Sequence, residues 1–281
     1  MRRYHANIQR APRPTHPRVY HRPIRIRLVM HNHFQEQESI FKLLAEMGGN
    51  AELQLSTAME IFTRNNPELV QKVDAADHRV DQLDRTINDL CFQYVTKYSP
   101  VADDLRAVFS TMKISLHLER IGDYSKNIAI RSSVLDHDKL QNIRGAISRM
   151  GAAVKKSLSE VLNTISNKDF ELAVQVWRKD AAIDEFYNTI FTDIVQTTTA
   201  RPMDVGDGTH LLFISRNLER IGDHIGNIAE VVHFWVTGQR LEEQRPYYED
   251  TSHYAPYNQP GLDLPANVNT NSPNSTIKKI S

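Results

Sequence analysis

The sequence predicts an all-α protein made of two tandem three-helix bundles, and proline placement is the first of two observations behind this prediction. Of the 12 prolines, only Pro67, Pro100 and Pro202 lie in the long middle of the chain. Proline removes a helical hydrogen-bond donor and clashes with the preceding turn. The middle of the chain is therefore predicted to form long helices that are broken at these three prolines. Turn-forming residues at 136–138 and 167–169 add two more breaks. We therefore expect six helices, at residues 36–64, 68–98, 101–135, 139–166, 170–199 and 204–237.

Apolar residues recur at helical spacing within these segments. Steps of three and four place them on one face, as expected of helices that pack lengthwise against each other. Long helices with one apolar face and short connections stack antiparallel into bundles. The clearest stripes are Val73, Val80, Ile87, Cys91 and Tyr94 in the second helix and Val176, Ile183, Tyr187, Ile190 and Ile194 in the fifth.

An internal repeat is the second observation. Residues 113–130 and 213–230 align without gaps at a spacing of 100, with 11 of 18 positions identical. The earlier helices align at a spacing of 103, which pairs Met47 with Met150, Gly48 with Gly151, Asp77 with Asp180, Val80 with Ile183 and Asp81 with Asp184. The chain therefore divides into a first repeat at residues 34–138 and a second at 139–239.

The two ends differ from this repeated body. Residues 1–33 contain eight Arg and no Asp or Glu, and we expect a basic disordered arm or a start codon assigned too early, with Met30 as the alternative start. A basic arm that contacts membrane phospholipid or nucleic acid is the other interpretation. Residues 240–281 are rich in Pro and Asn, and we expect a polar disordered tail.

Composition narrows the class of protein. Residues 34–239 hold 22 basic and 29 acidic side chains, a poor match to nucleic acid and a good match to cations. No apolar run approaches the length of a membrane span. The single cysteine, Cys91, excludes an internal disulfide and fits a cytoplasmic protein, and we expect it to be a packed core thiol.

A repeated motif carries the chemistry. Leu118-Glu119-Arg120-Ile121-Gly122-Asp123, followed by Asn127-Ile128-Ala129, returns at residues 218–223 and 227–229. Residues four apart on a helix lie on one side, with Cβ atoms about 5–6 Å apart. Each motif therefore forms a ridge of oxygen-bearing side chains, which we call the first and second acidic ridge. Their members are Ser115, Glu119, Asp123 and Asn127 in the first and Ser215, Glu219, Asp223 and Asn227 in the second.

The second helix of each repeat adds two carboxylates. Asp77 and Asp180 interrupt apolar stripes, where an unpaired carboxylate is costly, and Asp81 and Asp184 follow four residues later. Four acidic groups from two helices predict an all-oxygen site for Mg, Mn, Fe or Zn in each repeat. The alternative is a solvated face on which Glu119 pairs with a neighbouring basic side chain.

Three further features of the motif are the glycines, the arginines and a histidine. Gly122 and Gly222 lie mid-helix at a cost of about 1 kcal/mol relative to Ala, so we expect another group to approach the backbone closely there. Arg120 and Arg220 either balance the acidic cluster or bind anions. His224 lies off the ridge, and we expect a surface histidine.

The repeated L-E-R-I-G-D-x-x-x-N-I-A pattern resembles the signature of the PhoU family. Supporting matches are Ala45-Glu46-Met47-Gly48, Asp77-His78-Arg79-Val80-Asp81 and Asp103-Asp104-Leu105-Arg106. The resemblance covers about residues 36 to 238, and the Arg-rich arm and polar tail depart from the family pattern. It implies a cytoplasmic, usually dimeric protein that works with a phosphate-specific ABC transporter and a membrane sensor histidine kinase, restraining the phosphate-starvation response when phosphate is plentiful.

The resemblance also implies roles for individual residues. The family's E-x-x-x-D motifs hold metal ions, in some members as multinuclear clusters. By carry-over Glu119, Asp123, Glu219 and Asp223 are the primary metal ligands. Additional ligands are expected at Asp77, Asp81, Asp180 and Asp184, with auxiliary roles for Asn127, Asn227, Arg120 and Arg220.

Rival functions make different predictions. A carboxylate-bridged di-iron enzyme needs a Glu-x-x-His pair, whereas Glu119 and Glu219 are each followed at the third position by Gly. A purely structural helical adaptor predicts acidic ridges that bind no metal. A DNA-binding regulator is disfavoured by the acidic body. We therefore expect a non-enzymatic, metal-binding regulator that acts through protein–protein contacts and does not bind nucleic acid.

Overall fold

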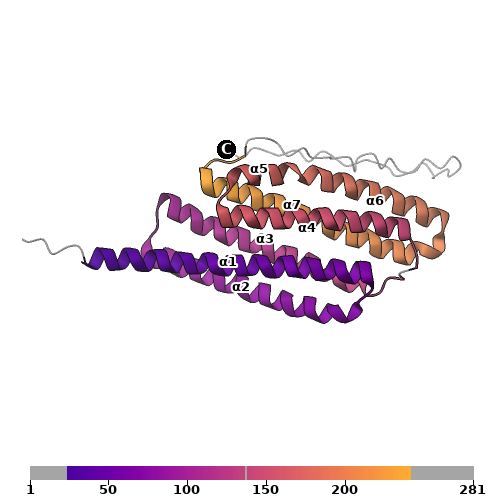
Figure 1. The fold of residues 1–281 in the computed structure, drawn as a ribbon, viewed down its shortest axis with the longest axis horizontal. Coiled ribbons are helices and arrows are strands. Elements are labelled where there is room, and N and C mark those ends of the chain that lie inside the picture. Colours follow the sequence, from indigo (N-terminus) through magenta and orange to yellow (C-terminus); the bar gives the residue numbers. More distant parts are fainter. Residues whose placement is uncertain (1–23, 137, 242–281) are drawn as a thin grey trace, which may run out of the picture. The chain divides into compact units, whose positions relative to one another are not determined.

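The computed structural model describes residues 24–136 and 138–241 (Figure 1). Within these ranges every regular element is helical. Short 3₁₀ turns, η1 (Pro67–Leu69) and η2 (Pro202–Asp204), precede the second and the last helix. The α-helices are α1 (Ile24–Arg64), α2 (Val70–Tyr98), α3 (Ala102–Ser132), α4 (Gln141–Asn167), α5 (Phe170–Arg178), α6 (Asp180–Ala200) and α7 (Val205–Thr237).

The predicted class and repeat are confirmed, with two differences. Helices α1–α3 form the first three-helix unit and α4–α7 the second. Helix α1 begins at Ile24, so residues 24–33, expected in the arm, are helical; the rest of the arm and the tail from residue 242 lie outside the described residues. The expected fifth helix is interrupted at Lys179, whose N–H bonds to Val176 O at 3.1 Å in a tight i→i−3 turn. That turn makes Asp180 the first residue of α6.

Helix ends follow the turn chemistry of the sequence. Pro67 and Pro202 each open a 3₁₀ turn, where the missing N–H would be unsatisfied in any case. Helix α2 ends at Tyr98, and its C-cap Ser99 adopts a left-handed φ of 46° immediately before Pro100. Asp169 caps α5 by accepting a hydrogen bond from Leu172 N at 2.9 Å. These local signals explain the breaks between the expected helices.

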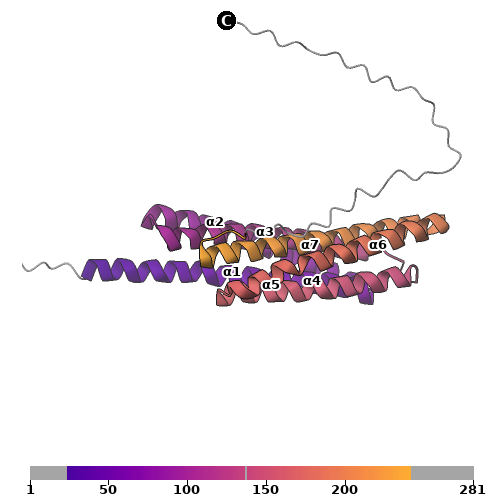
Figure 2. The ribbon, with the colours of Figure 1, turned by 90° about the horizontal axis from the view of Figure 1, so that it is seen from above.

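Helices α3 and α7 pack side by side and antiparallel at the centre, and their contact is the most extensive between any two helices (Figures 1 and 2). Near one end, Arg106 Nε donates to Trp235 O at 2.9 Å. Near the other, Arg131 lies 4.1 Å from the centre of the Phe213 ring. Since these are the two helices that carry the repeated motif, the repeats meet through their third helices.

The buried apolar residues form one continuous core through both repeats. The two predicted stripes are buried except for Tyr187, which is partly exposed. Cys91 is fully buried, as expected of a packed thiol, and burial raises its pKa to about 12. None of the described helices combines the length and the apolar character needed to cross a membrane.

Candidate metal centres on the acidic ridges

The first acidic ridge lies along α3, with Arg120 between its two carboxylates. Arg120 Nε is 3.3 Å from Glu119 Oε2, and its Nη1 is 3.2 Å from Asp123 Oδ2. Burial raises the pKa of Glu119, and the charge of Asp123 raises it further. Burial also raises the pKa of Asp123, with Asp77 as the next cause. Arg120 was expected either to balance the acidic cluster or to bind anions, and these contacts favour charge balance with Glu119 and Asp123.

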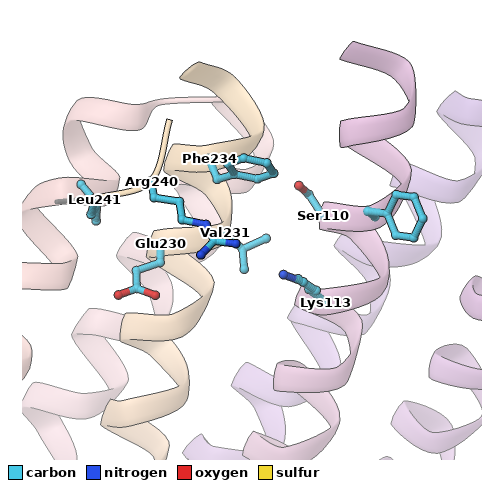
Figure 3. Close-up of a pocket in the computed structure, with 8 residues that line it drawn as sticks. Ser110, Lys113, Glu230, Val231, Phe234, Arg240 and Leu241 are labelled. Carbon is cyan, nitrogen blue, oxygen red and sulfur yellow. The ribbon is translucent and has the colours of Figure 1, made fainter. Parts of the chain in front are cut away.

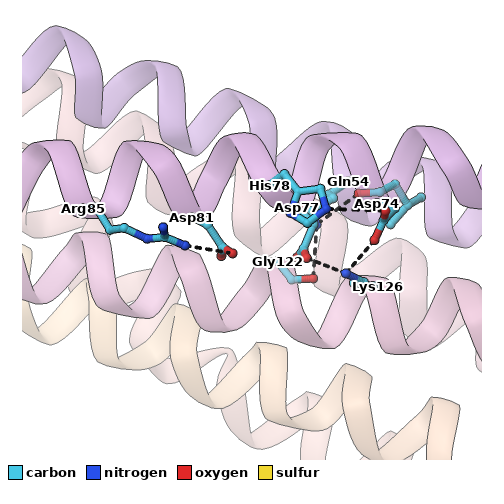
Figure 4. A network of polar contacts seen from close by, with 9 residues as sticks. Gln54, Asp74, Asp77, His78, Asp81, Arg85, Gly122 and Lys126 are labelled. Carbon is cyan, nitrogen blue, oxygen red and sulfur yellow. Dashed lines mark hydrogen bonds and ion pairs between the residues drawn. The ribbon is translucent and has the colours of Figure 1, made fainter.

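Asp77 of α2 is the most enclosed carboxylate of this cluster, and Figure 4 shows its surroundings. It accepts hydrogen bonds from Gln54 Nε2 at 3.1 Å and from Lys126 Nζ at 2.8 Å. Lys126 also lies 2.6 Å from Asp74 Oδ1, and hydrogen bonds to these two aspartates raise the pKa of Lys126 above its ordinary value. Asp77 thus already has a cation in contact.

The remaining predicted ligand of the first repeat, Asp81, is turned further toward solvent. Arg85, one turn later on α2, lies 3.7 Å from it (Figure 4). The charge of Asp81 contributes to the raised pKa values of both Glu119 and Asp123. The structure therefore brings the four predicted acidic groups of the first repeat into one electrostatic cluster.

The mid-helix glycines make room for polar groups, as expected. A Cβ at Gly122 would lie 2.9 Å from Oε1 of the buried Gln54, which reaches in from α1. A Cβ at Gly222 would lie 3.1 Å from Asp180 Oδ1 and equally close to Ile183. In the second repeat the glycine therefore lets a carboxylate approach the backbone of α7 one residue before Asp223.

Glu219 is the centre of the second acidic ridge. Its side chain is 13% exposed, and its Oε1 accepts a hydrogen bond from Arg216 Nη1 at 3.0 Å. Its Oε2 is buried and accepts no hydrogen bond within the described part of the chain. Burial raises the pKa of Glu219 to about 7, and the negative charges of Asp223 and Asp184 contribute to that rise.

These observations test whether the residues suit a metal ion. The oxygen donors are hard, Arg216 and Arg220 offset only part of the burial and repulsion that raise the pKa of Glu219, and a buried carboxylate oxygen there lacks a partner among the described residues. These properties fit a divalent cation. The donors are not closed into a coordination shell, because no three His, Cys, Asp or Glu side chains of the described residues lie close enough together to hold a metal as they stand.

The predicted auxiliary residues of the ridges differ in burial. Asn127 is exposed and Asn227 is partly buried. Arg220 is exposed, and its positive charge counts among the influences that lower the pKa of Glu219. Arg220 therefore acts on the ridge through charge.

Sequence reasoning missed side chains that bind the predicted carboxylates. Gln54 and Lys126 bind Asp77 in the first repeat, and Arg216 binds Glu219 in the second. The aligned repeats differ at two of these three positions: Lys126 aligns with Gly226, and Arg216 aligns with Leu116. The aligned segments differ at five further positions, so a difference between the repeats does not by itself identify a residue that balances charge.

His224 corrects an expectation. It is not a surface histidine, because its Nδ1 lies 2.9 Å from the Nδ1 of His117 on α3, and its ring stacks on Tyr124 with centroids 5.6 Å apart. Burial in this α3–α7 contact lowers the pKa of His224 to about 4. The side chain is covered because the two repeats meet along this face, which periodicity within one helix does not reveal.

Fold and site together define a class: an all-α protein of two three-helix repeats that pack through their third helices, each bearing an acidic E-x-x-x-D ridge. The PhoU domain is matched twice along the sequence, at residues 44–131 and 147–232. The chain belongs to the PhoU family.

Curated relatives carry the same family name. A protein of Caulobacter vibrioides named phosphate-specific transport system accessory protein PhoU homolog is 40% identical over 213 residues, which cover 74% of this chain and 93% of the relative. A Rhizobium meliloti protein of the same name is 30% identical, over 78% of this chain and 92% of the relative.

Solved structures agree with the fold. PhoU from Pseudomonas aeruginosa aligns with a TM-score of 0.71 at 30% identity, covering 73% of this chain and 99% of that one. The phosphate transport system regulatory protein PhoU from Streptococcus pneumoniae aligns with a TM-score of 0.70 at 24% identity, over 75% of this chain and all of that one. The second likeness concerns the fold alone.

Proposed function

We propose that this chain is a non-enzymatic accessory protein of a phosphate-specific transport system, and that it restrains the phosphate-starvation response when phosphate is plentiful. The observation that carries the proposal is the pair of PhoU domains, each coincident with one three-helix repeat. Two points support it further: the relatives described above are named accessory proteins, and one solved neighbour is named a regulatory protein. The regulator works by contact with partner proteins rather than by chemistry on a substrate.

The partners are proposed from the family resemblance. They are a second copy of this chain, the ATPase subunit of the phosphate ABC transporter and the sensor histidine kinase of the phosphate two-component system. The protein would act in the cytoplasm and reach the membrane through these partners. A shared binding surface would let the occupancy of the transporter alter signalling by the kinase.

The proposed cofactors are divalent metal ions, one or more at each acidic ridge, with Fe, Zn, Mn and Mg as candidates. In the first repeat the ligands would come from Glu119, Asp123, Asp77 and Asp81, and in the second from Glu219, Asp223, Asp180 and Asp184. The raised pKa values of Glu119, Asp123 and Glu219 support the proposal, since a bound cation would relieve the repulsion that raises them. The case is stronger in the second repeat, where the pKa of the buried Glu219 is raised to about 7.

A metal-free helical adaptor is the second candidate, and a specific observation favours it. Arg120, Lys126 and Arg216 already supply positive charge to the ridges. Elemental analysis of the purified protein beside Glu119→Ala/Glu219→Ala, after a mild chelator wash, separates the two candidates. Metal near one ion per repeat that disappears in the variant supports the metal sites. Metal-free wild-type protein supports the adaptor, and metal retained in the variant refutes Glu119 and Glu219 as ligands.

The regulatory role is tested in a host strain that lacks the gene. Deletion should switch on a phosphate-starvation reporter in phosphate-rich medium, and the wild-type chain should restore repression. Asp123→Ala/Asp223→Ala should weaken repression with unchanged far-UV circular dichroism. The matched control is Asp193→Asn, an exposed change on α6 away from both ridges. A reporter that stays repressed in the deletion strain would refute the regulatory role.

A further inference from the structure

A cavity of about 390 Å³ opens between α3 and the end of α7, away from both acidic ridges (Figure 3). On α3 it is lined by Ser110 and Lys113, which precede Glu119 by at least one helical turn. On the other side are Val231 and Phe234 of α7 and Arg240, which follows the helix. Its volume falls within the range of small-molecule sites, about 300–1,000 Å³.

The polar groups of the cavity include an unsatisfied buried hydroxyl. Ser110 is 1% exposed, and its Oγ has no hydrogen-bond partner within the described residues. Other buried serines of α3 behave differently: Ser125 and Ser132 each donate to the carbonyl four residues earlier, at 2.7 Å. Figure 3 shows the Ser110 hydroxyl directed from α3 toward the α7 side of the cavity. Since buried polar groups are nearly always satisfied, this one calls for an external partner.

Two cations reach the same space. The Lys113 ammonium is directed from α3 toward α7, and the Arg240 guanidinium approaches from the opposite wall (Figure 3). Neither forms an ion pair with a carboxylate of the described residues. Glu230 also lines the cavity but accepts a hydrogen bond from Trp177 Nε1 at 3.1 Å. The three charged side chains leave a net charge of +1.

The lysine that lines the cavity is not repeated at the other end of the repeat pair. The residue that matches Lys113 in the second repeat is Phe213, and Arg131 lies over its ring at 4.1 Å. The second repeat therefore has an aromatic ring covered by a guanidinium at the position where the first repeat has a lysine that lines the cavity. Two identical repeats would have produced matching ends, so the cavity arises from side chains that this chain does not share between its repeats.

We propose that this cavity binds a small oxyanion that carries an apolar or aromatic body, such as a phosphate monoester or a carboxylate. The oxyanion accepts from Lys113, Arg240 and the Ser110 hydroxyl, the kind of charge-assisted contact for which arginine and lysine are suited. The body lies against Val231 and Phe234, which line the same space. The proposal is independent of the metal sites, because none of these side chains belongs to an acidic ridge.

Titration calorimetry on the full chain tests the proposal with phenyl phosphate and benzoate as probes, and their relative affinities identify the preferred head group. At least one should bind at a single saturable site. Lys113→Gln and Ser110→Ala should each weaken it about tenfold, as expected for loss of one charge-assisted or buried hydrogen bond. The matched control is Lys156→Gln, an exposed lysine on α4, which should bind as the wild type does.

Several outcomes would overturn the proposal. They are an absence of saturable binding by both probes, binding that survives Lys113→Gln together with Ser110→Ala, and binding of neutral benzyl alcohol as tight as that of benzoate. Inorganic phosphate that binds as tightly as phenyl phosphate would exclude a role for the apolar wall. Both substituted side chains lie at the cavity and not in a ridge, so metal content should stay at the wild-type level. Thermal melts verify that each variant is folded.

Discussion

Lys126 Nζ lies 2.8 Å from Asp77 Oδ2 in the first repeat, whereas the matching position of the second repeat is occupied by the uncharged Gly226. The second repeat instead places Arg216 beside Glu219, where the first repeat has Leu116. Each acidic cluster is therefore balanced by an internal cation from a different place. The two clusters share the same carboxylates, but the positively charged side chain that balances them differs between the repeats.

The first prediction follows from this ion pair. Lys126→Met should destabilise the metal-free protein by about 2 kcal/mol, because it leaves the buried Asp77 carboxylate without its cation. Divalent metal should then stabilise the variant more than the wild type, since Asp77 becomes available as a ligand. Thermal melts with and without Mn²⁺ measure both effects. Lys156→Gln is the control, and equal metal-induced shifts in Lys126→Met and wild type would contradict the prediction.

The second prediction concerns the glycine in the first motif. Ala in place of an exposed mid-helix Gly normally stabilises a helix by about 0.5–1 kcal/mol. At Gly122 the added Cβ would lie 2.9 Å from buried Gln54 Oε1, so Gly122→Ala should destabilise the protein by about 1–3 kcal/mol. Chemical denaturation measures the free energy of unfolding. Gly49→Ala in α1 is a matched control, because nothing lies within 4 Å of its added Cβ, and it should be neutral or stabilising.

The sequence predicted what depends on local spacing. Prolines and turn residues located the breaks between the expected helices, and the i, i+4 spacing of Glu119 and Asp123 put them on one ridge. The break at Lys179 was missed because neither proline nor glycine marks it. The start of α1 at Ile24 was missed because residues 24–33 share the basic composition of the arm, although they contain no proline.

The rest of the site depends on packing between helices. Gln54 comes from α1, 68 residues before Gly122, and no periodicity within one helix could connect them. The same holds for His117 and His224, which meet only because α3 and α7 run antiparallel. The positions of the carboxylates along each helix were predictable, whereas the groups that neutralise them were not.

The third prediction concerns the link between the repeats. Asp207 of α7 accepts a hydrogen bond from Asp136 N at 3.2 Å and lies 3.1 Å from Lys139 Nζ. Burial alone would raise the pKa of Asp207, but these two hydrogen bonds and the lysine charge lower it below its ordinary value of 3.8. The stabilisation is therefore present above that value and is lost as the pH falls through the lowered pKa.

Asp207→Asn should accordingly reduce the free energy of unfolding by about 1 kcal/mol at pH 7. The difference from wild type should shrink at pH 3, which lies below the ordinary value of 3.8, because Asp207 in the unfolded wild-type chain then takes up a proton. Melting curves at the two pH values, with Asp193→Asn as the exposed control, measure the effect. A pH-independent difference would show that Asp207 acts through packing rather than charge.

The last prediction separates a metal ligand from a structural carboxylate. The pKa of Glu219 in the folded protein is about 7, above the ordinary value of 4.5. A carboxyl group with a raised pKa stabilises the fold below its ordinary pKa, and that contribution is lost as the pH rises through 7. At pH 8 the charged Glu219 therefore weakens the metal-free protein through its burial and its repulsion with Asp223 and Asp184.

Glu219→Gln should then stabilise the metal-free protein at pH 8 by about 1–3 kcal/mol, since one pKa unit corresponds to about 1.4 kcal/mol. The gain should vanish near pH 5, where wild-type Glu219 carries a proton. Added Mn²⁺ should reverse the order at pH 8, because the wild type gains a bound cation and the variant loses a ligand. Denaturation curves at both pH values, with and without Mn²⁺, measure all four states. A variant that is less stable than wild type at pH 8 without metal would contradict the prediction. It would show that charged Glu219 stabilises the fold as the partner of Arg216, and metal could then not reverse the order of stability.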